Sequence, residues 1–253
     1  MNLPSIEAGS GPPVVLLHGL LGSSRNWNSL IRSLAGFRHA IALDLPNHGS
    51  APWADTMAYR DLAGEVAGAI ERIGPSAAVL GHSMGGKVAM TLALTRPELV
   101  ERLIVVDIAP VAYSHSFTAY IRAMRSVPLG LGRRGDVDAV LAQTIADARV
   151  RAFLSQNLDG MPGAWRWKPN LAVLEQAMGE ILAFPDFPIG VRYEGSVLVI
   201  AGAESDYVRP RDEPAIHRLF PNAAIRRISG AGHWVHADRY DEFLGAVTHF
   251  LAP

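Results

Sequence analysis

The sequence predicts an α/β protein with a mostly parallel central sheet flanked by helices, and with an inserted helical cap. Three observations predict it: short apolar runs bounded by breaker residues, helix-like stretches between them, and one long block without such runs. Short, wholly apolar runs are typical of strands buried on both faces, as the strands of parallel sheets are. Strands that alternate with helices indicate βαβ units.

Six segments are the strand candidates. Five are apolar runs, at residues 14–17, 40–43, 77–80, 103–106 and 197–200, and the last is residues 224–228, Ala-Ile-Arg-Arg-Ile. Apolar residues at helical spacing lie between them and after them. The expected helices span residues 27–34, 59–73, 84–94, 214–220 and 240–251.

The alternation stops at about residue 112 and resumes after about residue 192. The intervening block has helical patterns over 117–124, 137–154 and 171–182, broken by segments rich in glycine and proline, and no strand-like run stands out. The sequence therefore predicts two parts. Residues 1–111 and 193–253 form the core domain, and residues 112–192 form a mostly helical cap.

Composition narrows the class of protein. The chain has 253 residues, of which 49% are hydrophobic and 19% charged, so it can bury a large core. A net charge of −1 gives no sign of the excess positive charge that binding to nucleic acid or to an anionic membrane requires. No secretory signal or membrane-spanning run is visible, and the absence of cysteine fits a reducing compartment. We expect a cytoplasmic monomer or homodimer that binds no nucleic acid and does not insert into a membrane.

Residues 81–85, Gly-His-Ser-Met-Gly, match the G-x-S-x-G motif between a strand candidate and a helix candidate. Such a tight strand-to-helix turn holds its central residue in strained geometry with its side chain pushed outward. Glycines on either side remove side chains that would collide, and the start of the helix offers N–H groups to negative charge. Ser83 is therefore the expected nucleophile. A chance glycine turn is the alternative, which this context disfavours.

His233 is the expected general base, which a serine hydroxyl needs at neutral pH. It lies in a glycine-rich turn, residues 230–234, after the last strand candidate. His236 is a rival whose place before the closing helix favours a structural role. No further ligands cluster near these two histidines, so we expect no metal and no cofactor.

The acid that orients the base has two candidates. Asp107 ends the fourth strand candidate, and Asp206 follows the fifth, one residue later than the usual Gly-x-x-Asp spacing, which places Ser205 at that position. Both aspartates are expected at the carboxyl edge of the sheet, where α/β sites are built. We favour Asp107, with Ser205 as a helper, and keep Asp206 open; Glu204 is the outsider.

The loop after the first strand candidate, His-Gly-Leu-Leu-Gly at 18–22, is the expected oxyanion loop. In this arrangement one N–H comes from that loop and the other from the residue after the nucleophile. The predicted donors are the backbone N–H groups of Leu20 and Met84.

With these residues the chain resembles α/β-hydrolases, in particular the group of α/β-hydrolase domain-containing protein 11 and its small bacterial esterase relatives. The matching segments are residues 81–87, 106–110, 165–167 with 170–171, and 230–237. The resemblance implies a helical cap over a serine–histidine–acid site that acts on short or medium acyl esters. It also implies that Asp107 is the acid, assisted by Ser205. Asp206 and Pro46 depart from the pattern of the group.

We therefore expect a carboxylesterase that cleaves small-molecule esters through an acyl-enzyme on Ser83. Cap and loop residues with large apolar side chains are expected to line its pocket, namely Phe117, Tyr120, Met124, Trp167 and Trp234. A thioesterase, a lactonase or a carbon–carbon bond hydrolase would use the same residues. A catalytically silent binding protein on this fold is the alternative of a different class.

Overall fold

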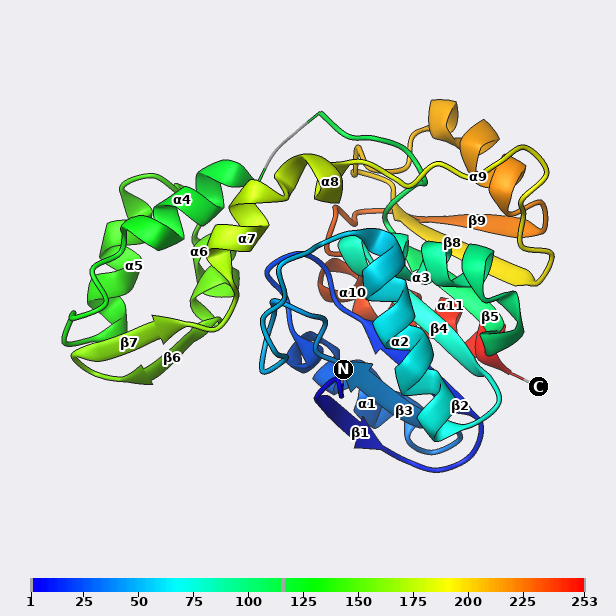
Figure 1. Cartoon of the computed structure of the whole chain (residues 1–253), viewed down its shortest axis with the longest axis horizontal. Coiled ribbons are helices and arrows are strands. Elements are labelled where there is room, and N and C mark those ends of the chain that lie inside the picture. The colour runs from blue at the N-terminus through cyan, green and yellow to red at the C-terminus, as the bar shows by residue number, and fades with distance from the viewer. Residues whose placement is uncertain (1, 115–116, 253) are drawn as a thin grey trace.

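The computed structural model describes residues 2–114 and 117–252, and its core is a seven-stranded sheet (Figure 1). The strand order is β1-β3-β2-β4-β5-β8-β9. The strands are β1 Ser5–Ala8, β2 Pro13–Leu17, β3 His39–Leu43, β4 Ala77–His82, β5 Val100–Val106, β8 Ser196–Gly202 and β9 Ala223–Ile228. All neighbours pair in parallel except β1 and β3. The predicted α/β fold with a mostly parallel sheet is confirmed.

Helices cover both faces of this sheet because its strands are apolar on both faces. Alternate residues of β2 enter two different apolar clusters: Val15 and Leu17 pack toward helices α2 and α3, while Val14 and Leu16 pack toward α1 and α11. The helices of the core are α1 Asn28–Leu34, α2 Tyr59–Ile73, α3 Met84–Thr95, α9 Glu213–Leu219, α10 Val235–Asp238 and α11 Tyr240–Leu251. Short 3₁₀ turns η1 Ser24–Trp27, η2 Pro97–Leu99 and η3 Pro210–Asp212 complete it.

Strand β1 was not predicted from the sequence. It is four residues long, lies at the edge of the sheet and pairs antiparallel with β3. Its residues alternate between exposed and half-buried, so it lacks the continuous apolar run that marks the central strands β2, β3, β4, β5 and β8.

Residues 112–192, called the cap segment below, contain five helices and one hairpin within the part that the structure describes. Most of these elements lie to one side of the sheet (Figure 1). They are α4 Thr118–Ser126, α5 Arg134–Ala142, α6 Ala148–Ser155, β6 Leu158–Met161, β7 Ala164–Trp167, α7 Leu171–Gln176 and α8 Met178–Leu182. The exact limits of a separate cap domain remain a prediction.

Three expectations for the cap segment were wrong. The helix expected over 171–182 is two short helices, α7 and α8, separated at Ala177. The glycine-rich stretch at 159–163 was expected only to break a helix, yet it belongs to the antiparallel pair β6–β7, whose glycines Gly160 and Gly163 have φ of 98° and 84°. The helix expected over 137–154 is two helices, α5 and α6. The Asp147 carboxylate accepts the N–H of Arg149 at 2.7 Å and so starts α6 as an N-cap.

No helix in the described part of the chain is long and apolar enough to cross a membrane.

Candidate active site

Ser83 lies in the tight turn between β4 and α3, with φ of 52° and ψ of −119°. A left-handed φ is costly for a residue with a side chain, so the surroundings must hold it. The Ser83 N–H donates to the carbonyl oxygen of Val106 at 3.0 Å. A Cβ atom on Gly81 would lie only 2.1 Å from the carbonyl oxygen of Gly85, so the turn closes only because both positions lack side chains.

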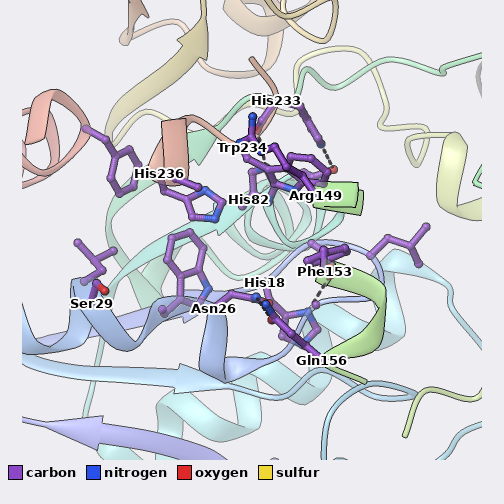
Figure 2. Close-up of a pocket in the computed structure, with 18 of the residues that line it drawn as sticks. His18, Asn26, Ser29, His82, Arg149, Phe153, Gln156, His233, Trp234 and His236 are labelled. Atoms are coloured by element: carbon purple, nitrogen blue, oxygen red, sulfur yellow. Dashed lines mark hydrogen bonds between the residues drawn. The ribbon is translucent and has the colours of Figure 1, made fainter. Parts of the chain in front are cut away.

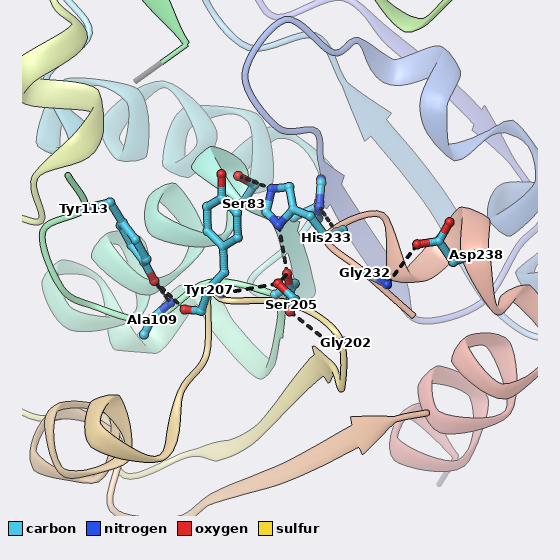
Figure 3. A network of polar contacts seen from close by, with 11 residues as sticks. Ser83, Ala109, Tyr113, Gly202, Ser205, Tyr207, Gly232, His233 and Asp238 are labelled. Carbon is cyan, nitrogen blue, oxygen red and sulfur yellow. Dashed lines mark hydrogen bonds and ion pairs between the residues drawn. The ribbon is translucent and has the colours of Figure 1, made fainter. Parts of the chain in front are cut away.

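His233 lies on the loop that joins β9 to α10, beside Ser83 (Figure 3), and hydrogen bonds link it to Ser83 and to Asp107. Its Nδ1 is 2.8 Å from Asp107 Oδ2, and its Nε2 is 3.0 Å from Ser83 Oγ. The carboxylate can only accept, so Nδ1 donates to it and Nε2 is left to accept the hydroxyl proton. The ring of Tyr207 stacks on the imidazole with a centroid distance of 3.8 Å. The three predicted residues therefore form one continuous chain of hydrogen bonds.

Asp107 is fully buried directly after β5, with φ of 50°. Its Oδ1 accepts the N–H of Gly202 at 2.8 Å, and its Oδ2 accepts the hydroxyl of Ser205 as well as His233 Nδ1. These three hydrogen bonds hold the carboxylate in one orientation. Ser205 thus occupies the helper position expected from the sequence.

Asp206 does not reach this network. Its side chain is 85% exposed and pairs with Arg209 at 3.0 Å. The adjacent Glu204 is exposed as well. The inclusion of Asp206 among the site residues is corrected here, because residue 205 points inward at this turn while its two neighbours point to solvent.

The two predicted oxyanion donors flank Ser83. Leu20 lies in the loop after β2, Met84 opens helix α3, and both line a small cleft with Ser83. Within residues 2–114 and 117–252, neither of their N–H groups donates a hydrogen bond to another backbone atom. The loop is pressed against the turn: a Cβ atom on Gly19 would lie 3.3 Å from Ser83 Cβ. Two N–H groups beside one hydroxyl suit a developing oxyanion.

The histidines near Ser83 other than His233 have structural contacts. His18 Nε2 accepts the N–H of Leu45 at 3.0 Å, and His82 Nε2 donates to the carbonyl oxygen of His233 at 2.9 Å. Burial lowers the pKa of His18 and His82, and it lowers that of His236 to about 4. These rings are therefore neutral at pH 7, and His18 and His82 brace the loops of the site. A structural role was the expectation for His236.

Two cavities open at His233. The wide cavity, of about 590 Å³, is lined by Ser83 as well as His233. Figure 2 shows residues of the oxyanion loop, of helix α6 and of the segment after His233 around it. The narrow chamber, of about 270 Å³, lies between the cap segment and His233. The narrow chamber is lined by Leu21, Phe117, Tyr120, Val150, Phe153, Leu154, Tyr207, His233 and Trp234.

Three of the five predicted pocket residues line these cavities. Phe117 and Trp234 contact both of them, and Tyr120 lines the narrow chamber. Met124 and Trp167 do not, which corrects the prediction. They are buried against each other inside the cap segment, where the Trp167 indole donates to the Met124 carbonyl oxygen at 2.8 Å.

Several residues of the site region were not predicted, among them Arg149, Phe153 and Gln156 of the cap segment, and Tyr207. The helical spacing of residues 149, 153 and 156 was the available signal, but only the packing of α6 shows which face it presents.

A family model described as "alpha/beta hydrolase fold" matches residues 12–240. The chain belongs to the α/β-hydrolase fold family. This α/β-hydrolase is 42% identical over 252 residues to "sn-1-specific diacylglycerol lipase ABHD11" of Xenopus laevis, covering 95% of this chain and 80% of that protein. It is 31% identical to "Esterase YbfF" of Escherichia coli, with 94% and 92% of the two chains covered.

A solved structure named "Marine microorganism esterase" superposes on this α/β-hydrolase with a TM-score of 0.94 at 34% identity, covering 98% and 99% of the two chains. The resemblance to α/β-hydrolase domain-containing protein 11 and bacterial esterases, expected from the sequence, is therefore confirmed. The chain is a hydrolase of the esterase and lipase type.

Proposed function

We propose that this α/β-hydrolase cleaves carboxylic esters of short to medium acyl chains through an acyl-enzyme on Ser83. The observation that carries the proposal is the unbroken chain of hydrogen bonds from Ser83 through His233 to Asp107. A serine hydroxyl becomes an effective nucleophile when a positioned base takes its proton.

The proposed reaction has two displacements. His233 takes the Ser83 proton as Oγ attacks the ester carbonyl, and the N–H groups of Leu20 and Met84 stabilise the oxyanion. His233 then protonates the departing alcohol. Water, activated by the same imidazole, attacks the acyl-enzyme and releases the acid.

Asp107 is the proposed acid because it holds His233 Nδ1 and so fixes the tautomer that leaves Nε2 free to accept a proton. The Ser205 hydroxyl and the N–H of Gly202 hold the carboxylate in this orientation. Asp107 therefore stabilises the imidazolium that forms during each displacement, without taking up a proton itself.

The two cavities suit the two parts of an ester. The narrow chamber has mainly apolar and aromatic walls, which favours an acyl chain. The wide cavity has polar groups at its rim, among them Asn26, Arg149 and Gln156, and suits the alcohol portion. Glycerol esters fall within this proposal, since the relative from Xenopus laevis is named as a diacylglycerol lipase.

The first test is hydrolysis of p-nitrophenyl esters of graded acyl length by the wild type and by Ser83→Ala. The proposal expects turnover of short and medium esters by the wild type and loss of nearly all of it in the variant. A wild type that is inert at every chain length contradicts ester hydrolysis. A serine-directed phosphonate that also fails to label Ser83 would favour the silent binding protein.

A further inference from the structure

Helix α6 of the cap segment presents one face to the active site. Arg149, Phe153 and the C-cap residue Gln156 are spaced by four and three positions, so their side chains lie on the same side of the helix. All three line the wide cavity, as Figure 2 shows. This face contacts the loops on both sides of Ser83.

On one side α6 contacts the loop of His233. Arg149 Nη2 donates to Asp238 Oδ1 at 2.6 Å, and Asp238 Oδ2 accepts the N–H of Gly232 at 3.0 Å (Figure 3 shows the Gly232 contact). Gly232 directly precedes His233. The ring of Phe153 packs on that of Trp234, the residue after His233, at a centroid distance of 5.6 Å. Helix α6 therefore supports the residue on each side of His233: Gly232 through the Asp238 carboxylate, and Trp234 by direct packing.

On the other side the end of α6 contacts the oxyanion loop. The buried Asn157 donates its side-chain N–H to the carbonyl oxygen of Leu21 at 2.8 Å. Leu21 has φ of 58°, a strained conformation that needs support, and it adjoins Leu20, which lines a small cleft together with Ser83. Helix α6 and the residue after its C-cap thus contact both the loop of His233 and the loop that contains Leu20.

The Arg149–Asp238 contact is ionic and partly exposed. The Arg149 side chain is 67% exposed and that of Asp238 is 16% exposed. Burial by itself raises the pKa of Asp238, but hydrogen bonds from Arg149 and Gly232 outweigh it and hold that pKa below its ordinary value. The pair is therefore charged at neutral pH, and salt screens it.

We propose that Arg149 is a positioning residue through which the docked cap segment sets the geometry of the His233 loop, acting by way of the Asp238 carboxylate and the Gly232 N–H. The proposal rests on the proposed ester hydrolysis. It makes the reactivity of Ser83 depend on how α6 is docked, and not only on the residues that touch the substrate.

The test compares Arg149→Ala with Arg166→Ala. Arg166 is a matched control, since it is 76% exposed on β7 and pairs with Asp159 inside the cap segment. Asp238→Asn keeps an acceptor for the Gly232 N–H but loses the charge, and Asp238→Ala loses both. The readouts are kcat and KM for p-nitrophenyl acetate and for a medium-chain ester, and the rate of inactivation by a small methylphosphonate.

We expect Arg149→Ala and Asp238→Asn to lower kcat about two- to fivefold for both esters, with KM little changed, as loss of a partly exposed ion pair predicts. The double variant should be no worse than either single one, because both remove the same contact. Asp238→Ala should lower kcat about tenfold or more, since it leaves the Gly232 N–H without its acceptor. Arg149→Lys should restore part of the loss. About 1 M salt should lower the wild-type kcat toward that of Arg149→Ala.

Equal kcat values and inactivation rates for Arg149→Ala and Arg166→Ala would overturn the inference while leaving ester hydrolysis intact. A loss confined to the KM of the medium-chain ester, with unchanged phosphonate inactivation, would also overturn it, because Arg149 would then only contact the substrate. If the wild type cleaves no ester, the proposed function fails, and the phosphonate rates still decide whether Arg149 positions the His233 loop.

Discussion

The side-chain nitrogen of Lys87 donates a 2.8 Å hydrogen bond to the carbonyl oxygen of Leu182, which joins helix α3 to the last residue of helix α8. The carbonyl oxygen of Ala183 accepts a second bond at 2.6 Å, and the ring of Tyr113 lies 4.8 Å from Nζ. Lys87 is one helical turn beyond Ser83 and is 1% exposed. Its contacts therefore fix the exit of the cap segment directly against the helix that follows the nucleophile.

Burial lowers the pKa of Lys87 from 10.5 to about 7, which predicts a pH-dependent stability. Between about pH 7 and 10.5 the unfolded chain binds a proton that the folded protein lacks, so the free energy of unfolding rises with pH in this window. Below pH 7 the full cost of the buried charge is present. Urea unfolding of the wild type and of Lys87→Met at pH 7 and pH 10 measures this change in the free energy of unfolding.

Between pH 7 and pH 10 the free energy of unfolding of the wild type should rise by on the order of a few kcal/mol relative to that of Lys87→Met. Lys168→Met, which changes a less buried lysine, is the matched control and should follow the wild type. Parallel pH dependence in all three proteins would refute the prediction.

Asp107→Asn should lower kcat about 10⁴-fold, because an amide at this position leaves His233 in the wrong tautomer. Asp206→Asn should keep wild-type activity, since the Asp206 carboxylate pairs only with Arg209 at the surface. Steady-state kinetics on p-nitrophenyl acetate distinguish the two aspartates. The assignment of the acid fails if the Asp206 variant is the one that loses activity.

Gly81→Ala should destabilise the protein by about 1–3 kcal/mol or more, because the new Cβ would lie 2.1 Å from a backbone oxygen that side-chain motion cannot relieve. Gly64→Ala, in the middle of α2 with open space around its Cβ position, should stabilise it by about 0.5–1 kcal/mol. Chemical denaturation measures both. Similar effects of the two substitutions would show that the turn is less tightly packed than described.

Val150→Phe should shift the preference of the enzyme toward shorter acyl chains by filling the narrow chamber. Ala152→Phe, two residues away on α6, lines the wide cavity instead and should leave the acyl preference unchanged. Profiles of kcat/KM against acyl length compare the two. The assignment of the narrow chamber to the acyl chain is wrong if only the Ala152 variant changes the profile.

Much of the fold could be predicted because central strands and their helices carry strong local signals. The helix expected over 59–73 is α2 with the same bounds, and the turn at Ser83 lies between β4 and α3 as predicted. Strand β1 was missed because it forms only by pairing with β3. The hairpin β6–β7 was missed because it depends on positive φ at glycines. Neither feature produces a continuous apolar run in the sequence.

The choice between Asp107 and Asp206 as the acid could not be made from the sequence pattern, because it depends on which strands are neighbours in the sheet. Pairing of β5 with β8 brings the end of one strand beside the turn that follows the other, and only three-dimensional geometry shows that Ser205 points inward there. The contact between Arg149 and Asp238 spans 89 residues of sequence and has no local pattern. Long-range contacts of this kind lie beyond what periodicity and motifs can predict.

The cap segment leaves the core after β5 and returns at β8, which are neighbouring parallel strands. An insertion at this point never interrupts the pairing order of the sheet, whatever its length. The sheet therefore tolerates a different insertion between the same two strand ends. On the role proposed for Arg149, the reaction would carry over only with an insertion that rebuilds the contact of α6 with the loop of His233.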